Sequence, residues 1–218
     1  MKYYNIHTHR PCLDLEVVSI QNIRVQATSL GCSLPDLDQG YYSVGIHPWD
    51  VTAQSKGLRF EYLYEVARLP QVVAIGEAGL DKKQTTPLAL QQAIFELQIK
   101  LAETVQKPLL IHCVKAWSEL IAIKRQFKPS QPWIIHGYRG NAILAQQLLK
   151  HGFYLSYATY YNSRALPFGC LDHLFIETDD FETTIQSNYT QMASHLGVDI
   201  LQLQQVIANN FRLVFKRT

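Results

Sequence analysis

Residues 3–10 read YYNIHTHR, a short apolar run that leads into two histidines, His7 and His9. Five further apolar runs lead in the same way into a histidine or a carboxylate. The residues concerned are His47, His112, His136, Glu77 and Asp179. In an α/β barrel, the C-terminal ends of the parallel strands meet at one mouth, and this mouth carries the active site. The repeated pattern therefore predicts a barrel with metal-binding side chains at one end.

Eight strand-like segments can be counted along the chain, as a (β/α)8 barrel requires. They cover residues 2–9, 16–23, 42–47, 72–77, 108–113, 133–137, 153–157 and 174–178. Helical periodicity recurs between them, and two clear examples lie at residues 90–105 and 200–214. Strands separated by helices favour parallel pairing through right-handed crossovers. We therefore expect a distorted TIM barrel of the α/β class, in a single domain spanning residues 1–218.

The first quarter of the chain departs from this alternation. Only about seven residues separate the first two strand-like segments, whereas a crossover with a helix needs a dozen or more. Residues 24–40 contain Gly31, Pro35 and two aspartates, and this composition is typical of a loop. We expect the barrel to be trimmed in its first βα units. Later in the chain, Asn141 fits the N-cap of a helix and Gly152 fits the position after its C-cap.

The composition is that of a globular protein without a strongly charged surface. The 218 residues are 47% hydrophobic and 17% charged, and the net charge is +2. This balance does not predict a large nucleic-acid surface, so contacts to a polyanion would have to be local. No segment resembles a signal peptide or approaches the roughly 18 apolar residues of a membrane span. We expect a soluble, cytoplasmic protein.

The four cysteines are scattered along the chain at positions 12, 32, 113 and 170, without a Cys-x-x-Cys pair. This distribution predicts reduced thiols rather than a disulfide framework. Cys113 follows His112 and could in principle bind a metal. Because successive side chains of a strand point to opposite faces, we expect Cys113 to point away from the site.

The pair His7 and His9 is the first candidate for metal binding. The two residues are two positions apart on a predicted strand, so both imidazoles project from one face and can bind one ion at about 2.1 Å. An isolated His-x-His pair is weak evidence, because both rings could hydrogen-bond to backbone groups instead. The additional ligand types at equivalent strand ends favour the metal site.

The other candidate ligands come from four separate strands. Glu77 lies between glycines in AIGEAGLD, which let backbone pass close to the site, and its two oxygens can bridge two cations. His112 and His136 suit zinc or manganese better than magnesium, although either alone could be a structural histidine. Asp179 ends the last strand, where it can bind a metal and accept a proton from water. Its neighbour Asp180 is expected to be solvated or to act as a cap.

Substrate contacts are less well defined by the sequence. His47, in GIHPW, could contact substrate or orient a metal ligand, or it could satisfy backbone groups in a turn made rigid by Pro48. Four basic residues are candidates for phosphate contacts, although a solvated charged rim is the alternative for each. These residues are Lys82, Lys83, Lys115 and Arg139.

Taken together and in this order, the motifs resemble those of the TatD-type metal-dependent deoxyribonuclease family, within the amidohydrolase-like barrels. The motifs are NIHTHR, GIHPW, AIGEAGLD, PLLIHC, WIIHGYRGN, IETDD and NNFRLVF. The similarity extends from the first strand to the last helix. It implies a distorted (β/α)8 barrel with two divalent metal ions, zinc, manganese or magnesium, that hydrolyses phosphodiesters such as DNA.

By motif position, the resemblance implies the identity of the ligands. One ion would be held by His7, His9, Glu77 and Asp179. The second ion would be held by Glu77, His112 and His136. Asp179 would also take the proton from the attacking water, which makes Glu77 and Asp179 the catalytic residues. Two ions about 3.5 to 4 Å apart would stabilise the attacking and the leaving oxygen.

Several positions next to these ligands depart from the family pattern. Asn5 stands where an aspartate is usual, and Arg10 replaces an apolar residue. Val114 and Lys115 follow the fourth motif, where an arginine two residues after the histidine is common. Asp180 and Phe181 stand where serine and proline are usual. Because barrel loops set specificity and strand ends set mechanism, these departures bear on the substrate more than on the chemistry.

Three classes of function follow from the sequence. The leading hypothesis is a metal-dependent phosphodiesterase, a DNA 3′-end exonuclease as the resemblance implies. The alternative is a hydrolase of small amides, lactones or phosphoesters on the same barrel. A metal-stabilised binding or scaffold module is the third class, and it predicts metal without an open coordination position. A steep loss of DNA binding with added salt would distinguish the first hypothesis.

Overall fold

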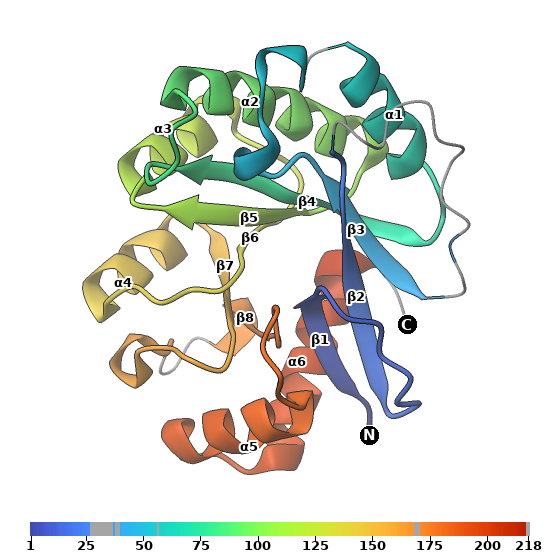
Figure 1. Ribbon diagram of the computed structural model, residues 1–218. Helices are drawn as coiled ribbons and strands as arrows, with labels where there is room; N and C mark the ends of the chain where they lie inside the picture. The colour runs from blue at the N-terminus through green and yellow to red at the C-terminus, as the bar shows by residue number, and fades with distance from the viewer. Residues whose placement is uncertain (27–36, 38–39, 56, 168–170, 217–218) are drawn as a thin grey trace. The chain divides into compact units, whose positions relative to one another are not determined.

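A computed structural model of the chain describes residues 1–26, 37, 40–55, 57–167 and 171–216 (Figure 1). Every predicted strand is present. The strands are β1 (Tyr3–Thr8), β2 (Val17–Arg24), β3 (Tyr41–Gly45), β4 (Val72–Asp81), β5 (Leu109–Val114), β6 (Trp133–Ile135), β7 (Phe153–Tyr157) and β8 (Leu174–Ile176). They follow one another in sequence order, as in a (β/α)8 TIM barrel. The main difference from the prediction is β4, which continues four residues past Glu77 to Asp81.

Helices lie between the later strands and after the last one. The α-helices are α1 (Leu58–Ala67), α2 (Leu88–Val105), α3 (Trp117–Phe127), α4 (Ala142–Lys150), α5 (Ile185–Leu196) and α6 (Ile200–Phe215). Short 3-10 turns cover η2 (Pro48–Asp50), η3 (Ala53–Ser55), η4 (Ser163–Ala165) and η5 (Leu171–His173). The predicted cap of α4 is confirmed, because the side chain of Asn141 accepts a hydrogen bond from the backbone N–H of Leu144 at 2.9 Å. Gly152 follows this helix with φ +71°.

The chain forms two compact units. The first unit contains Met1–Gln21 and Ile134–Thr218, and the second contains Asn22–Trp133. In the first unit, β1 pairs with β2 and β7 pairs with β8, both in parallel. A parallel bridge between Thr8 and Asp179 joins the ends of the first and last strands. This pairing brings His7 and His9, at the end of β1 and just after it, next to the carboxylates that follow β8.

Helix α6 covers β1 and β8 in the first unit. The ring of Phe211 lies 4.6 Å from that of Tyr4 on β1, and the ring of Phe215 lies 5.8 Å from that of Phe175 on β8. All four rings are buried. The apolar spacing predicted for residues 200–214 therefore places a continuous hydrophobic face on these two strands.

The expected irregularity near the N-terminus is confirmed. Residues 9–16 connect β1 to β2 without a helix, although the two strands run parallel, with Tyr3 opposite Val17. The loop predicted over residues 24–40 begins after β2, but most of it lies outside the described residues. The connection from β1 to β2 is therefore a loop in place of a crossover helix.

In the second unit, β4 lies between β3 and β5 in a parallel sheet (Figure 1). Every residue of β4 is buried, as expected for a parallel strand covered on both faces. Helix α2 contributes Gln98, whose side chain accepts a hydrogen bond from the backbone of Ile46 and donates one back to it, at 2.8 and 3.0 Å. A Cβ atom on Gly79 would overlap the carbonyl oxygen of His112, so glycine permits the close approach of β4 and β5.

The two described cysteines are both free thiols. Cys12 is exposed, and Cys113 is buried. Burial raises the pKa of the Cys113 thiol to about 12, which disfavours the thiolate that a metal ligand requires. Cys32 and Cys170 lie outside the described residues. None of the described helices has the length and apolar character to cross a membrane. The cytoplasmic location and the single-domain organisation stay predictions.

Candidate metal centre

Histidines and carboxylates lie together in two groups, one in each unit. The first group consists of His7, His9, His136, Glu177 and Asp179. The second group consists of His47, Glu77, Asp81 and His112. Each unit holds at least one set of three side chains whose donor atoms all lie within 4.8 Å of one another. Within the units, these sets are His7 with His9 and Asp179, His136 with Glu177 and Asp179, and His47 with Glu77 and His112.

Asp179 lies close to His7 of β1 and to His9, which directly follows that strand. Its Oδ1 atom is 3.6 Å from Nε2 of His7 and 3.5 Å from Nε2 of His9. Backbone pairing holds this arrangement, since the N–H of Asp179 donates to the carbonyl of His7 at 3.1 Å. The N–H of His9 donates in turn to the carbonyl of Asp179 at 3.3 Å. The side chains predicted to share an ion on this side therefore converge through the strand register.

The carboxyl group of Asp179 is ionised at neutral pH. Burial raises its pKa, but hydrogen bonds with His7 and His9 and the nearby charge of His136 outweigh burial, so the pKa lies well below its usual range. An ionised carboxylate is the form that binds a cation. Asp180, the neighbouring residue, is exposed as predicted.

His136 is oriented by a buried carboxylate. Its Nδ1 atom lies 3.3 Å from Oε1 of Glu177, and the same oxygen accepts a hydrogen bond from the backbone of Gly137 at 2.7 Å. Because this oxygen already acts as an acceptor for Gly137, the contact favours the imidazole proton on Nδ1 and leaves Nε2 for a metal. The side chain of Asn188 fixes the backbone carbonyl of Glu177 at 2.7 Å.

His112 has the corresponding partner in the second unit. Its Nε2 atom lies 3.3 Å from Oδ2 of Asp81, and its Nδ1 atom lies 3.6 Å from Oε1 of Glu77. Burial raises the pKa of Asp81, but hydrogen bonds from Trp49, at 2.7 Å, and from the backbone of Lys83, at 2.8 Å, help to lower it below its usual range. The carboxylate therefore favours a proton on Nε2 of His112 and leaves Nδ1 available to an ion.

The tautomer of His47 is set by the backbone of the turn that follows it. Its Nδ1 atom accepts a hydrogen bond from the backbone of Trp49 at 3.1 Å, and its Nε2 atom lies 3.4 Å from Oε1 of Glu77. Burial lowers the pKa of His47, and hydrogen bonding to Glu77 opposes this only in part. A neutral ring that accepts at Nδ1 carries its proton on Nε2. His47 therefore orients Glu77 by donating to it, and a contact to substrate stays a prediction.

The predicted basic residues have different surroundings. Lys82 forms an ion pair with Glu119 at 2.6 Å, and the guanidinium of Arg139 lies 5.2 Å from the ring centroid of Phe181. Lys83 and Lys115 are exposed. Their proposed contacts to phosphate stay predictions.

Two residues of the groups, Asp81 and Glu177, were not identified from the sequence. Both were detectable by the alternation of side chains along a strand. Asp81 lies four positions after Glu77, and Glu177 lies two positions before Asp179, so each is in phase with a predicted ligand. The motif resemblance also implies that Glu77 binds an ion together with His7, His9 and Asp179, and that His136 binds one together with His112. These shared ligand sets stay predictions.

The chemistry of these donors fits a divalent cation. Neutral imidazoles and ionised carboxylates are the forms that bind metals, and this mixture suits zinc or manganese. Metal-ligating histidines characteristically donate their second ring N–H to a carboxylate. His112 and His136 each have one ring nitrogen 3.3 Å from such a carboxylate oxygen. The residues of both groups, apart from Glu77 in the middle of β4, lie near or beyond the C-terminal ends of parallel strands, where barrel enzymes carry their catalytic residues.

Comparison with known sequences reveals a family relationship. A family model described as "TatD related DNase" matches residues 26–216. The "3'-5' ssDNA/RNA exonuclease TatD" of Edwardsiella piscicida is 31% identical over 219 residues, which cover 88% of this chain and 83% of that protein. The human "3'-5' RNA nuclease TATDN2" is 37% identical over 129 residues, or 54% of this chain and 17% of that protein.

The match to some relatives is partial. The "3'-5' ssDNA/RNA exonuclease TatD" of Klebsiella pneumoniae is 33% identical over 57% of this chain, and the chain spans 52% of its length. The chain thus spans about half the length of the Klebsiella pneumoniae relative and 17% of the length of the human relative.

Solved structures show the same fold. A TatD homologue from Escherichia coli K12 has a TM-score of 0.81 at 19% identity, covering 99% of this chain and 98% of the other. A TatD family hydrolase from Entamoeba histolytica has a TM-score of 0.80 at 14% identity, covering 100% and 99%. The likeness extends over the whole chain, in agreement with the TIM-barrel fold.

Proposed function

The chain belongs to the TatD-related DNase family of metal-dependent hydrolases, and from this premise we propose that it removes nucleotides from the 3′ end of single-stranded nucleic acid. The observation that carries the proposal is a repeated contact, a histidine held by a buried carboxylate. It occurs between His112 and Asp81 and again between His136 and Glu177. Repetition in two groups of donor residues indicates prepared metal sites rather than isolated structural histidines.

Each group would hold one divalent ion, either zinc, manganese or magnesium. In the first group, the ligands would be His7, His9, His136 and Asp179. His136 is placed here rather than with the second ion, as the motif resemblance implied, because its donor atoms lie together with those of Glu177 and Asp179 in the same unit. In the second group, they would be Glu77 and His112. When bound, such ions lower the pKa of the attacking water and neutralise charge that develops on the phosphodiester.

The remaining chemistry is assigned to side chains of the chain itself. Asp179 is ionised at neutral pH, so its carboxylate can accept the proton of the attacking water. Nε2 of His47 would hold the carboxylate of Glu77 in place by hydrogen bonding. Asp81 and Glu177 would fix the tautomers of His112 and His136, which leaves one nitrogen of each ring to bind.

The test is hydrolysis of a single-stranded DNA oligonucleotide labelled at its 5′ end. Metal-stripped protein is resupplied with magnesium, manganese or zinc, beside the variants Glu77→Ala and Glu61→Ala. Glu61 is an exposed carboxylate on α1 and serves as the matched control. We expect stepwise, metal-dependent shortening by the wild type and by Glu61→Ala, and none by Glu77→Ala. Absence of shortening by the wild type with all three metals would overturn the proposal and favour a small-molecule hydrolase.

A further inference from the structure

Three planar side chains lie together on the surface of the first unit. The rings of Tyr160 and Phe181 are 5.1 Å apart and meet edge to face at 82°. The guanidinium of Arg139 lies 5.2 Å from the centroid of the Phe181 ring. Tyr160 is 65% exposed, Arg139 is exposed and Phe181 is half-buried. We call these three residues the stacking platform.

The stacking platform lies on the same rim as the first group of candidate ligands. Arg139 follows His136 by three residues, and Phe181 follows Asp179 by two. Tyr160 follows β7, and β7 pairs in parallel with β8. The loop after β6 is joined to β7 in turn, because the backbone N–H of Tyr138 donates to the carbonyl of Ser156 at 2.9 Å. All three residues therefore belong to loops that leave the C-terminal ends of adjacent strands.

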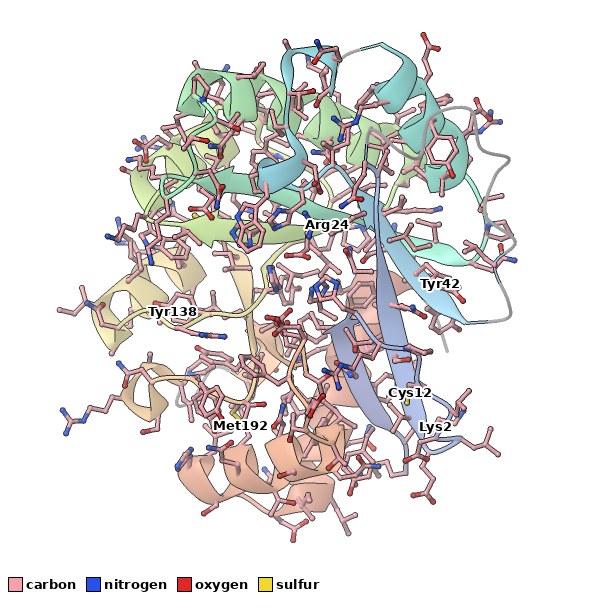
Figure 2. All side chains as sticks on the ribbon, in the orientation of Figure 1. Lys2, Cys12, Arg24, Tyr42, Tyr138 and Met192 are labelled. Atoms are coloured by element: carbon pink, nitrogen blue, oxygen red, sulfur yellow. The ribbon has the colours of Figure 1, made fainter. Side chains whose placement is uncertain are left out.

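Buried aromatic packing holds two of these loops. Tyr138, labelled in Figure 2, lies with its ring 5.7 Å from that of Tyr157, which in turn lies 5.6 Å from that of Tyr161. The hydroxyl of Tyr138 donates to the backbone of Asn141 at 2.8 Å, and that of Tyr157 donates to Ala165 at 2.7 Å. Because the loops are fixed, a ligand on the stacking platform would lose little free energy in ordering them.

The charges around the stacking platform indicate which part of a substrate fits it. Asp180 is exposed beside Phe181, and Glu182 on the other side forms an ion pair with Arg10 at 3.2 Å. Because Glu182 is paired with Arg10, it is the carboxylate of Asp180 that disfavours a phosphate directly on the Phe181 ring. A neutral planar group is favoured there, since it can stack on an aromatic ring or on the guanidinium plane.

We propose that the stacking platform binds an unpaired nucleobase of the substrate strand, at or beside its 3′ terminus. This inference rests on the proposed function, and it adds a subsite that recognises the base rather than the phosphate. Asp180 and Phe181 are two of the positions at which the sequence departs from the TatD-type pattern. Stacking contributes about 1–3 kcal/mol per base, so its loss weakens binding by about 5-fold to 150-fold.

Binding is measured first without catalysis. An oligonucleotide with 2-aminopurine at its 3′ terminus is titrated with metal-stripped protein in EDTA, and the quenching of its fluorescence reports stacking. We expect quenching by the wild type and by Tyr160→Phe. The double variant Tyr160→Ala with Phe181→Ala should show at least 5-fold weaker binding and little quenching. Tyr64→Ala is the matched control, because Tyr64 is a partly exposed ring on α1 beside the guanidinium of Arg68 at 5.7 Å.

A second measurement separates this inference from the proposed function. The rates of 3′ shortening are compared for an oligonucleotide with a normal terminal base and for one with an abasic terminal residue. We expect the wild type to prefer the normal terminus by about 5-fold or more, and the double variant to lose this preference. Equal rates for both substrates in the wild type would overturn the proposed nucleobase subsite, while the proposed phosphodiesterase activity would still hold.

If the wild type cleaves neither substrate, the proposed function fails and the 2-aminopurine titration decides the stacking platform alone. Quenching that is absent in the wild type, or unchanged in the double variant, would overturn it. Circular dichroism of each variant confirms that the fold is kept.

Discussion

The side chain of Asn5 and residue Thr178 are joined by two hydrogen bonds in opposite directions. Nδ2 of Asn5 donates to Oγ1 of Thr178 at 2.8 Å, and the backbone N–H of Thr178 donates to Oδ1 of Asn5 at 3.0 Å. Both residues are buried. The pair ties β1 to the segment after β8 and so fixes the approach of His7 to Asp179. A neutral amide forms both bonds without burying a charge, which gives the asparagine at this family-variant position a structural role.

We therefore predict that Asn5→Ala lowers the free energy of unfolding by about 1–3 kcal/mol, because the buried N–H of Thr178 loses its acceptor. Urea denaturation of the metal-stripped protein measures the change. Asn209→Ala is the control, since Asn209 is exposed on α6 and its loss should change the stability by less than about 0.5 kcal/mol. Equal stability of wild type and Asn5→Ala would contradict the structural role.

Much of the fold could be predicted because strand ends carry distinctive residues. The apolar runs before His47, His112 and His136 gave the correct strands to within a few residues. The extension of β4 to Asp81 was not predicted, because Gly76 and Gly79 interrupt the apolar pattern that marks a strand. The backbone of β4 nevertheless continues beside β5, since these glycines allow close approach.

The candidate site was less predictable in its hydrogen bonding. Spacing identified the histidines but not which ring nitrogen carries the proton. That property depends on partners such as the backbone of Trp49 for His47, which only the folded chain reveals. The contact between Tyr160 and Phe181 was also not predictable, because it joins two irregular loops without periodicity.

The contact of Asp81 with His112 leads to a prediction about metal affinity. Asp81→Asn keeps the shape of the side chain but removes the charge that favours a proton on Nε2 of His112. We expect divalent metal binding to weaken by about 10-fold to 100-fold, as for other carboxylate partners of metal-ligating histidines. Isothermal titration calorimetry with zinc and with manganese measures this. The control is Asp172→Asn, at an exposed carboxylate in η5, which should bind metal like the wild type. Unchanged metal affinity in Asp81→Asn would contradict the role of Asp81 as the partner of a metal-binding His112.

Lys124 gives a prediction about pH and stability. Burial lowers the pKa of this lysine to about 8, and the charge of Glu103 opposes burial only in part. Between pH 8 and the ordinary lysine pKa of about 10.4, the folded protein binds fewer protons than the unfolded chain, so stability rises with pH in this window. Below pH 8 this contribution is constant.

We expect Lys124→Met to remove that rise, whereas Lys83→Met, at an exposed lysine, should keep it. Urea denaturation at several values between pH 7.5 and pH 10 measures the slope of each protein. A slope that is the same in wild type and Lys124→Met would show that Lys124 keeps an ordinary pKa.

Asp179→Asn tests the proton acceptor separately from binding. The amide keeps one oxygen for a cation and nearly the same volume, but it cannot take a proton from water at neutral pH. We expect the rate of 3′ shortening to fall by about 100-fold to 10,000-fold, the usual effect of losing a general base. Calorimetry must show that the variant still binds metal. Asp172→Asn, at an exposed carboxylate in η5, should keep a rate near that of the wild type. If the metal-loaded Asp179→Asn protein cleaves at the wild-type rate, another group accepts the proton.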